Sequence, residues 1–262
     1  MKLDGCTALI TGASAGLGRE FARQLAPRAR ALVLVARRTE RLEELRDELT
    51  QQYPALKVHV HGEDLSKHKS VSQLCGFLAE QSIVPDFLIN NAGLGDRGEF
   101  ASADFGRIND MAQVNVVSLT LLTHKLLPAM IAARRGAILN VSSSASFMPI
   151  PEMGVYAATK AYVTSFTEAL RSEVRACGIT VSALCPGPVH TEFDQVARRA
   201  NQTGKLAPEF TYVPPEQVVR EALAGIERDQ PIVIPGLAMK IAMTLVRLTP
   251  MFVLRLAGRI GR

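Results

Sequence analysis

The chain of 262 residues contains no tryptophan, and aromatic residues make up only 5% of it. The core of a folded domain must therefore be built from Leu, Ile, Val and Ala. Cysteine is also scarce, and the four that occur form no C-x-x-C pair: Cys6, Cys75, Cys177 and Cys185. This spacing argues against a disulfide framework and predicts buried thiols in a reducing compartment. The five histidines show no metal-ligand spacing, so we expect no metal site.

Acidic residues are absent from residues 236–262, where five basic residues lie: Lys240, Arg247, Arg255, Arg259 and Arg262. This stretch carries the whole net charge of +5, and residues 1–235 are neutral. The charge therefore argues against a nucleic-acid-binding body. The first residues, MKLDGCTALIT, run directly into a strand pattern and leave no room for a signal peptide, so we expect a cytoplasmic protein.

Short apolar runs alternate with amphipathic helical stretches along residues 1–235. The strand-like runs are 7–11, 31–36, 57–62, 86–93, 136–143, 178–187 and 230–236. The helical patterns between them are 16–26, 39–52, 67–81, 109–134, 154–176 and 215–228. Seven such strands separated by helices predict one α/β domain with a Rossmann-like, doubly wound parallel sheet in a three-layer α/β/α sandwich. Its ligands should bind at the carboxyl ends of the strands.

The loop TGASAGLG (Thr11–Gly18) joins the first strand to the first helix. Gly12 permits a tight turn, Gly16 lets a pyrophosphate approach the backbone, and Gly18 allows close packing of helix and strand. The phosphates would then meet free N–H groups at the helix N-terminus. Three glycines also occur in ordinary turns between a strand and a helix, but the position of this loop favours a dinucleotide site.

The second strand ends in VARRTE, which places Arg37 and Arg38 where an acidic residue would bind the ribose 2′-hydroxyl of NAD. A guanidinium instead matches a 2′-phosphate, which it can bind with two hydrogen bonds. Ser14 in the glycine loop adds a hydroxyl. We therefore predict NADP(H); the alternative is a pair of solvated arginines at the start of a helix.

The segment GVYAATKAY puts Tyr156 and Lys160 four residues apart, on one face of a predicted helix. Taken alone, the pair is compatible with an exposed helix surface. It is also the arrangement in which a cation tunes a tyrosine for proton transfer.

With these motifs in order, the chain resembles the short-chain dehydrogenase/reductase family over roughly residues 3–235. The matching segments are TGASAGLG at 11–18, EDLS with Asp64, NNAG at 90–93, QVNVVS with Asn115, NVSSSAS at 140–146, YAATK at 156–160 and PGPVHT at 186–191. The resemblance implies that residues 1–235 form the catalytic domain and that residues 236–262 are a C-terminal extension.

The resemblance also implies roles for individual residues. Ser143 lies thirteen residues before Tyr156, the spacing of the catalytic serine in the family, with Ser142 and Ser144 as the neighbours that a register slip would choose. The implied catalytic residues are Asn115, Ser143, Tyr156 and Lys160, with Asn115 holding a water. The implied cofactor-binding residues are Gly12, Ser14, Gly16, Leu17, Gly18, Arg37, Arg38, Asp64, Leu65, Asn91, Ala92, Gly93, Tyr156, Lys160, Pro186, Gly187, Val189 and Thr191.

Reduction of a ketone needs an acid that protonates the developing alkoxide, and we assign this role to Tyr156. Lowering a phenol pKa from about 10 to roughly 7 takes about 4 kcal/mol. An ammonium about 5 Å away at an effective dielectric near ~20 supplies about 3 kcal/mol. We therefore expect Lys160 to lower the pKa of Tyr156, the positive nicotinamide to add the remainder, and Ser143 to donate to the substrate oxygen.

Two loops should determine the substrate. Residues 146–154 offer Phe147, Met148, Ile150 and Met153, and residues 190–215 have the length of a functional lid. The apolar lining predicts a hydrophobic ketone or secondary alcohol, of the 3-ketoacyl, steroid-like or aromatic type. Arg198, Arg199 and Lys205 are candidates for an anionic carrier or simply solvated charges. The alternative functions are an NADP-sensing regulator without catalysis and a structural subunit.

The extension after Gly236 is apolar and basic, and Pro250 divides it into two short helices that cannot span a bilayer. It is predicted either to pack or form an oligomer, or to lie on a membrane surface. The family pairs through the helix at 154–176, which implies homodimers or homotetramers.

Overall fold

The computed structural model describes residues 2–199, 209–250 and 252–253. Its strands form one parallel sheet in the order β3-β2-β1-β4-β5-β6-β7. Their bounds are β1 (Thr7–Thr11), β2 (Ala31–Ala36), β3 (Lys57–Gly62), β4 (Phe87–Asn90), β5 (Gly136–Val141), β6 (Ile179–Leu184) and β7 (Ile232–Val233). The reversal of strand order between β1 and β4 opens a crevice at their carboxyl ends, which is where ligands bind in such sheets.

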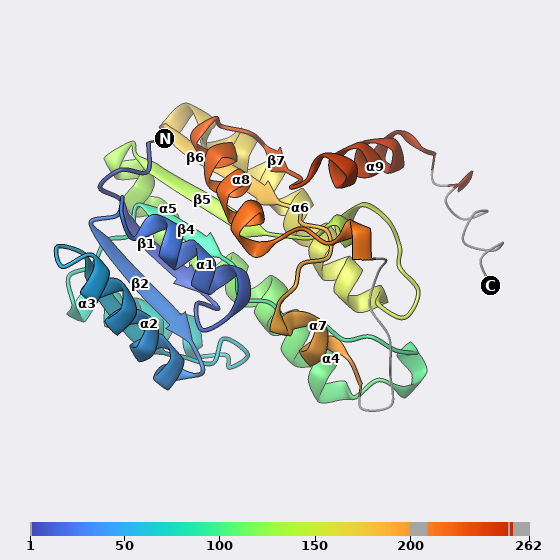
Figure 1. Cartoon of the computed structure of the whole chain (residues 1–262), viewed down its shortest axis with the longest axis horizontal. Helices are drawn as coiled ribbons and strands as arrows, with labels where there is room; N and C mark the ends of the chain where they lie inside the picture. Colours follow the sequence, from blue (N-terminus) through green and yellow to red (C-terminus); the bar gives the residue numbers. More distant parts are fainter. Residues whose placement is uncertain (1, 200–208, 251, 254–262) are drawn as a thin grey trace.

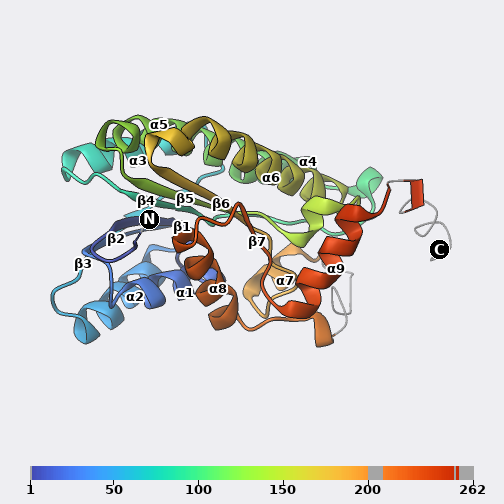
Figure 2. The same cartoon turned by 90° about the horizontal axis from the view of Figure 1, so that it is seen from above.

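Helices cover both faces of the sheet (Figures 1 and 2). One face carries α1 (Gly16–Leu25), α2 (Thr39–Gln52) and α8 (Pro215–Glu227). The other carries α3 (Ser70–Glu80), α5 (Leu119–Ala133) and α6 (Gly154–Val174). The predicted three-layer, doubly wound fold with seven parallel strands is confirmed.

The core matches the composition, because it is aliphatic on both sides of the sheet. Leu42, Leu45 and Leu49, which form the apolar stripe of α2, are buried against β1 and β2 together with α1 and α8. On the opposite face, Leu74 of α3 and Leu122 of α5 lie in a second aliphatic cluster. Branched strand residues buried on both faces are typical of a sheet with two helical layers.

Several predicted boundaries were wrong. The helix predicted at 109–134 begins four residues earlier, as α4 (Phe105–Ala112), because Asp104 caps it by accepting a hydrogen bond from Arg107 N at 2.8 Å. The helix predicted from residue 67 begins at Ser70, after turns closed by backbone hydrogen bonds from Lys67 N and Ser70 N. The last strand has only two residues.

A π-helix (Gln113–Ser118) joins α4 to α5, so that Phe105–Ala133 is one long helical run. By length and composition this run is apolar enough to cross a membrane. Leu122 and Met130 instead pack in the core of the sheet, and Ser118 Oγ donates to Leu65 O at 2.7 Å. The run therefore serves as a layer of this fold.

Buried amides tie the central strands to the helices beneath the crevice. Asn90 Nδ2, on β4, donates to Asn140 Oδ1, on β5, at 2.8 Å and to Thr123 Oγ1, on α5, at 3.0 Å. Asn140 Nδ2 donates to Thr167 Oγ1, on α6, at 3.0 Å. All four side chains are buried, so each bond lies in a low-dielectric interior where an unpaired polar group is costly.

We expect Asn140→Leu to lower the free energy of unfolding by about 2–4 kcal/mol, because Asn90 loses a buried acceptor and the layers lose their link. Thermal unfolding followed by circular dichroism measures the change. The control is Asn109→Leu, at an exposed position of α4, which should stay within about 0.5 kcal/mol of the wild type. Unchanged melting of the Asn140 variant would contradict the importance of the network.

Candidate active site

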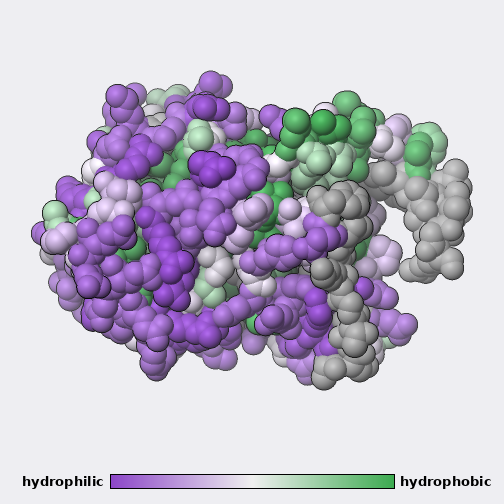
Figure 3. All heavy atoms as spheres, viewed as in Figure 1, coloured by the Kyte–Doolittle hydropathy of each residue, from purple (hydrophilic) through white to green (hydrophobic). Residues whose placement is uncertain are grey.

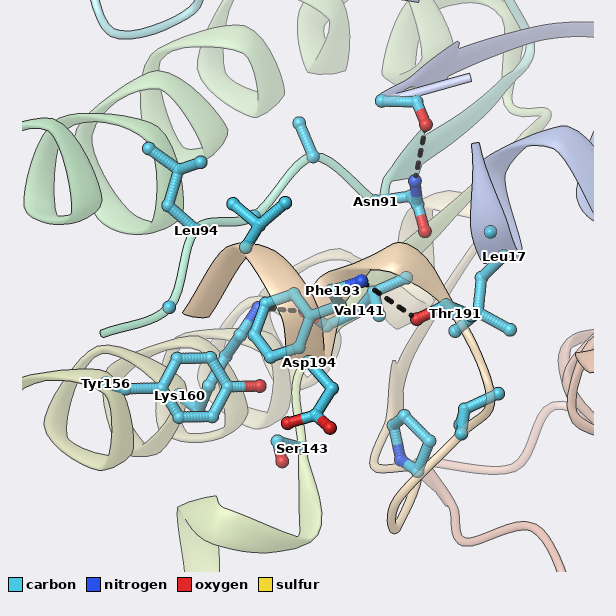
Figure 4. Close-up of a pocket in the computed structure, with 18 of the residues that line it drawn as sticks. Leu17, Asn91, Leu94, Val141, Ser143, Tyr156, Lys160, Thr191, Phe193 and Asp194 are labelled. Atoms are coloured by element: carbon cyan, nitrogen blue, oxygen red, sulfur yellow. Dashed lines mark hydrogen bonds between the residues drawn. The ribbon is translucent and has the colours of Figure 1, made fainter. Parts of the chain in front are cut away.

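A cavity of about 600 Å³ lies at the carboxyl ends of the strands. It is lined by the predicted catalytic and cofactor-binding residues with two exceptions, Gly18 and Asn115. Gly18 packs under the glycine loop, where an added Cβ would lie 2.2 Å from Gly12 O. Nearly all of the site residues that the sequence predicts therefore line one pocket, which Figure 4 shows in part.

The glycine loop follows β1 and opens α1 as predicted. Gly12 and Gly16 both have positive φ, of 67° and 52°, which favours glycine over other residues. Gly16 also faces Thr191, because an added Cβ would lie 3.1 Å from that side chain. Thr191 caps α7 (Glu192–Ala197) by accepting a hydrogen bond from Phe193 N at 3.3 Å.

The predicted nucleotide end of the pocket carries two arginines. Arg37 and Arg38 are exposed and line it, together with Asp64 and Leu65 after β3. The Arg38 guanidinium donates to Ser14 Oγ at 3.3 Å from Nη2 and 3.4 Å from Nε. Two elements far apart in the sequence thus meet through a hydroxyl and a cation, a combination suited to a phosphate oxygen.

Asn115 lies within the π-helix and is fully buried. Its Oδ1 accepts from Leu94 N at 2.8 Å, and its Nδ2 donates to Leu94 O at 2.9 Å and Thr159 Oγ1 at 3.0 Å. These bonds fix the chain that follows Asn91–Gly93 against α6. A π turn is frequent at functional sites. The role of Asn115 in holding a water stays a prediction.

The three consecutive serines after β5 have different partners. Ser142 Oγ is buried, donates to Lys160 O at 2.9 Å and contacts Thr164 Oγ1 at 2.7 Å. All three serines line the pocket, and the side chain of Ser143 is the one that interacts with the Tyr156 phenol, where it lowers the pKa of Tyr156. Ser144 begins a short 3₁₀ helix (Ser144–Phe147). The geometry therefore favours Ser143, the residue at the predicted spacing.

Tyr156 and Lys160 lie one turn apart on α6, and both are buried. Lys160 Nζ donates to Val141 O at 2.8 Å and lies 5.8 Å from the centre of the Tyr156 ring. Figure 4 shows the lysine beside the tyrosine. In the part of the chain that the structure describes, Val141 O is the one hydrogen-bond acceptor of this ammonium. Its remaining protons are available to the pocket that it lines.

The predicted effect of Lys160 on Tyr156 was wrong for the protein by itself. Burial raises the pKa of Tyr156 to about 12, and the nearby Ser143 side chain only partly opposes this rise. Burial also lowers the pKa of Lys160 to about 8. The estimate from sequence placed both groups in a medium of high effective dielectric, whereas the loss of water around them is the larger effect here.

The roof of the pocket comes from the predicted lid at residues 190–215 and from α9, a segment that the sequence did not assign to the pocket. Phe193, on α7, lies with its ring centre 5.4 Å from that of Tyr156. Met239 and Met243, on α9 (Leu237–Leu248), line the pocket, and an added Cβ at Gly187 would lie 2.5 Å from Met239 Cε. The two methionines are four residues apart and so share one helix face, which is the sequence feature that could have indicated an apolar inner face of α9.

The charges of the predicted lid have structural partners. Arg199 Nη2 pairs with buried Asp96 at 2.6 Å, and Arg198 pairs with Asp194, which lines the pocket. Lys205 lies outside the described residues, as do most of the predicted second helix of the extension and its arginines at 255, 259 and 262. The two described arginines therefore stabilise the lid rather than offering free charge to a carrier.

We expect the stability of the protein to depend on pH through Lys160. Because the pKa of this amine is about 8 in the folded protein and 10.5 ordinarily, the unfolded chain binds more protons between these values, and stability rises with pH there. Below pH 8 the burial of the charge costs up to about 3 kcal/mol. Lys160→Met removes this cost and loses one hydrogen bond of about 1 kcal/mol.

Thermal unfolding of Lys160→Met should therefore occur above that of the wild type at pH 7, by about 4–8 °C. The difference should shrink as the pH approaches 10.5. Lys125→Met, which removes an exposed lysine of α5, should change neither the unfolding temperature at pH 7 nor its dependence on pH. A variant that is less stable at pH 7, by an amount independent of pH, would contradict this account.

Comparison with known proteins agrees with the geometry. The short chain dehydrogenase family model matches residues 6–202. Sulfoacetaldehyde reductase 2 of Chromohalobacter salexigens is 37% identical over 201 residues, which cover 76% of this chain and 79% of the reductase. The very-long-chain 3-oxoacyl-CoA reductase of Anas platyrhynchos is 29% identical over 226 residues, which cover 85% and 69% of the two chains.

Among solved structures, the short-chain dehydrogenase from Sphingobium yanoikuyae in complex with NADPH aligns with a TM-score of 0.81 and 30% identity, covering 92% of each chain. The family model extends from β1 through the glycine loop and past the Tyr156–Lys160 pair. This chain therefore belongs to the short-chain dehydrogenase family of oxidoreductases.

Proposed function

We propose that this protein is an NADPH-dependent carbonyl reductase, or the same enzyme acting as an alcohol dehydrogenase, with a hydrophobic ketone or secondary alcohol as substrate. The observation that carries the proposal is the meeting of Ser143, Tyr156 and Lys160 with the glycine loop in one cavity. The family acts on such groups, and both reductases named above reduce carbonyl compounds by their names.

The residues present fit a nicotinamide dinucleotide. The glycine loop offers the N-terminus of α1 to a pyrophosphate, and the Lys160 ammonium has free protons for ribose hydroxyls. Arg38 and Ser14 favour the 2′-phosphate of NADP(H) over the hydroxyl of NAD(H). The NADPH in the structure from Sphingobium yanoikuyae supports the same choice.

A nicotinamide cofactor, held by the glycine loop, Arg38 and Lys160, would supply the hydride for the carbonyl carbon of the substrate. The Tyr156 hydroxyl donates its proton to the carbonyl oxygen, and the Ser143 hydroxyl donates a hydrogen bond to the same oxygen. Positive charge beside the phenol favours this transfer, because the protein alone raises the pKa of Tyr156 to about 12. Lys160 holds one such charge within reach of the ring.

The substrate end of the cavity supports a hydrophobic carbonyl compound. Met148, Ile150 and Met153 line it from the loop after β5, as predicted, and Met239 and Met243 line it from α9. Aliphatic and thioether groups select for apolar area and adapt to irregular shapes. A 3-ketoacyl, steroid-like or aromatic ketone fits this lining.

A regulator that senses NADP without catalysis is the alternative. It would need the nucleotide end of the pocket and would have no use for the serine, tyrosine and lysine at the other end. The burial of Lys160 beside Tyr156 costs stability, which is easier to understand if the pair acts on a substrate.

The test is NADPH oxidation by the purified protein with β-ketoacyl thioesters, steroid ketones and bulky aryl ketones. We expect turnover of at least one class, and Tyr156→Phe should lower kcat by about 10²–10⁴-fold because the proton donor is lost. NADPH binding, followed by fluorescence, should remain within about threefold, since the phenyl ring keeps the shape of the site.

The matched control is Tyr162→Phe, on the outer side of the same helix, where the hydroxyl contacts Thr120 Oγ1 at 3.0 Å. Its kcat should equal that of the wild type. Near-normal kcat of Tyr156→Phe would overturn the mechanism. NADPH binding by the wild type without turnover of any carbonyl compound or alcohol would favour the regulator.

We also propose that the protein forms a homodimer or homotetramer through α5 and α6. Val117 at the end of the π-helix, Leu121 at the start of α5 and Tyr162 on α6 are apolar or aromatic and partly exposed on this layer. Oligomers bury such side chains at symmetric interfaces.

A second surface supports peripheral membrane contact of a cytoplasmic protein. Figure 3 shows apolar side chains gathered over α9. Leu237, Ile241, Leu245 and Leu248 are exposed on this helix at spacings of three and four residues, so they form one outer face. The basic, acid-free stretch from 236 to 262 complements anionic headgroups. We propose that α9 lies on an anionic membrane surface.

Sedimentation with vesicles tests this contact. We expect the wild type to pellet with phosphatidylglycerol–phosphatidylcholine vesicles and much less with phosphatidylcholine alone. The double variant Ile241→Glu/Leu245→Glu should stay in the supernatant, whereas Val84→Glu, at an exposed apolar position elsewhere, should pellet like the wild type. Equal pelleting of the double variant, or none of the wild type, would contradict the proposal.

A further inference from the structure

Glu192, the first residue of α7, forms ion pairs with two arginines at the predicted nucleotide end of the pocket. Its carboxylate receives hydrogen bonds from Arg38 Nη1 at 2.8 Å and from Arg41 Nη1, on α2, at 2.6 Å. Each of its oxygens faces a different guanidinium, and these pairs lower the pKa of Glu192. The carboxylate of Glu192, in the segment that covers the pocket, therefore pairs with Arg38, a predicted ligand of the 2′-phosphate that follows β2.

The carboxylate uses the donors that a 2′-phosphate would use. Arg38 binds Glu192 through Nη1 and Ser14 Oγ through Nη2 and Nε, so its whole fork is engaged. Glu192 and the two arginines are each more than two-fifths exposed, and ion pairs of this exposure are weak and exchangeable. A phosphate dianion at the same place brings twice the charge and more acceptor oxygens.

We propose that Glu192 is a specificity-determining residue that competes with the 2′-phosphate of the cofactor for Arg38 and Arg41, and that Arg41 is a second ligand of that phosphate. The inference rests on the NADP(H) preference proposed above. A nucleotide with the phosphate must displace Glu192, whereas one with a 2′-hydroxyl leaves the ion pairs intact. Glu192 therefore weakens the binding of NADP(H) and leaves that of NAD(H) unaffected.

Arg41 was not among the residues that the sequence identified, because a partly exposed arginine in the first turn of a helix such as α2 is ordinary. The importance of Arg41 follows only from the structure, which places Glu192 of α7 within hydrogen-bond distance of it. Thr191 rests on Gly16, and this contact brings the next residue, Glu192, within reach of α2.

The test is the binding of adenosine 2′,5′-bisphosphate and of 5′-AMP, measured by titration calorimetry on the full chain. Neither ligand contains nicotinamide, so no turnover is involved. We expect Glu192→Gln to bind the bisphosphate about 3- to 10-fold more tightly, with a gain that shrinks at high salt, and to bind 5′-AMP unchanged. Arg41→Gln should weaken the bisphosphate by a similar factor and leave 5′-AMP unchanged.

The matched control is Glu44→Gln, an exposed residue of the same helix as Arg41, which removes one negative charge without touching the arginines. It should change neither affinity. An equal gain in this control, or a loss of affinity in Glu192→Gln, would overturn the inference. A wild-type preference for the bisphosphate that Glu192→Gln leaves unchanged would overturn the inference alone. Equal affinities for both nucleotides in both proteins would overturn the NADP(H) preference as well.

Discussion

The candidate site depends on a single ammonium group held out of water. Lys160 Nζ donates to the carbonyl of Val141, the last residue of β5, while Ser142 Oγ donates to the Lys160 carbonyl. These reciprocal bonds fix α6 against the end of β5, and they set the distance between Tyr156 and Ser143. Burial in this position disfavours the charged form of the amine and therefore lowers the pKa of Lys160.

The cavity that Lys160 lines has two chemically different ends. The proposed nucleotide end, around Arg38, is exposed and charged, so its contacts are weak singly and exchange readily. The proposed substrate end is apolar and covered by Phe193, Met239 and Met243. A ligand that spans both ends would be oriented by charge at one side and by shape at the other, which is how a hydride can be directed to one carbonyl carbon.

Sequence patterns predicted those features that depend only on residues close together in the chain. The glycine loop, the strands and the Tyr156–Lys160 spacing follow from turn chemistry and periodicity, and they carried the fold and most of the pocket. The direction of the Tyr156 pKa could not be predicted, because it depends on how completely neighbouring elements exclude water. Arg41 and Met239 were missed for a related reason, since the segments that face them are distant in the chain.

The π-helix at Gln113–Ser118 has a further consequence for the long run from α4 to α5. One extra residue in a turn rotates everything after it by about 100° relative to an uninterrupted α-helix. Asn115 can therefore point to Leu94 while Leu122 and Met130 still face the sheet. The insertion acts as a phase shift, and it lets one helix serve the active site at one end and the core at the other.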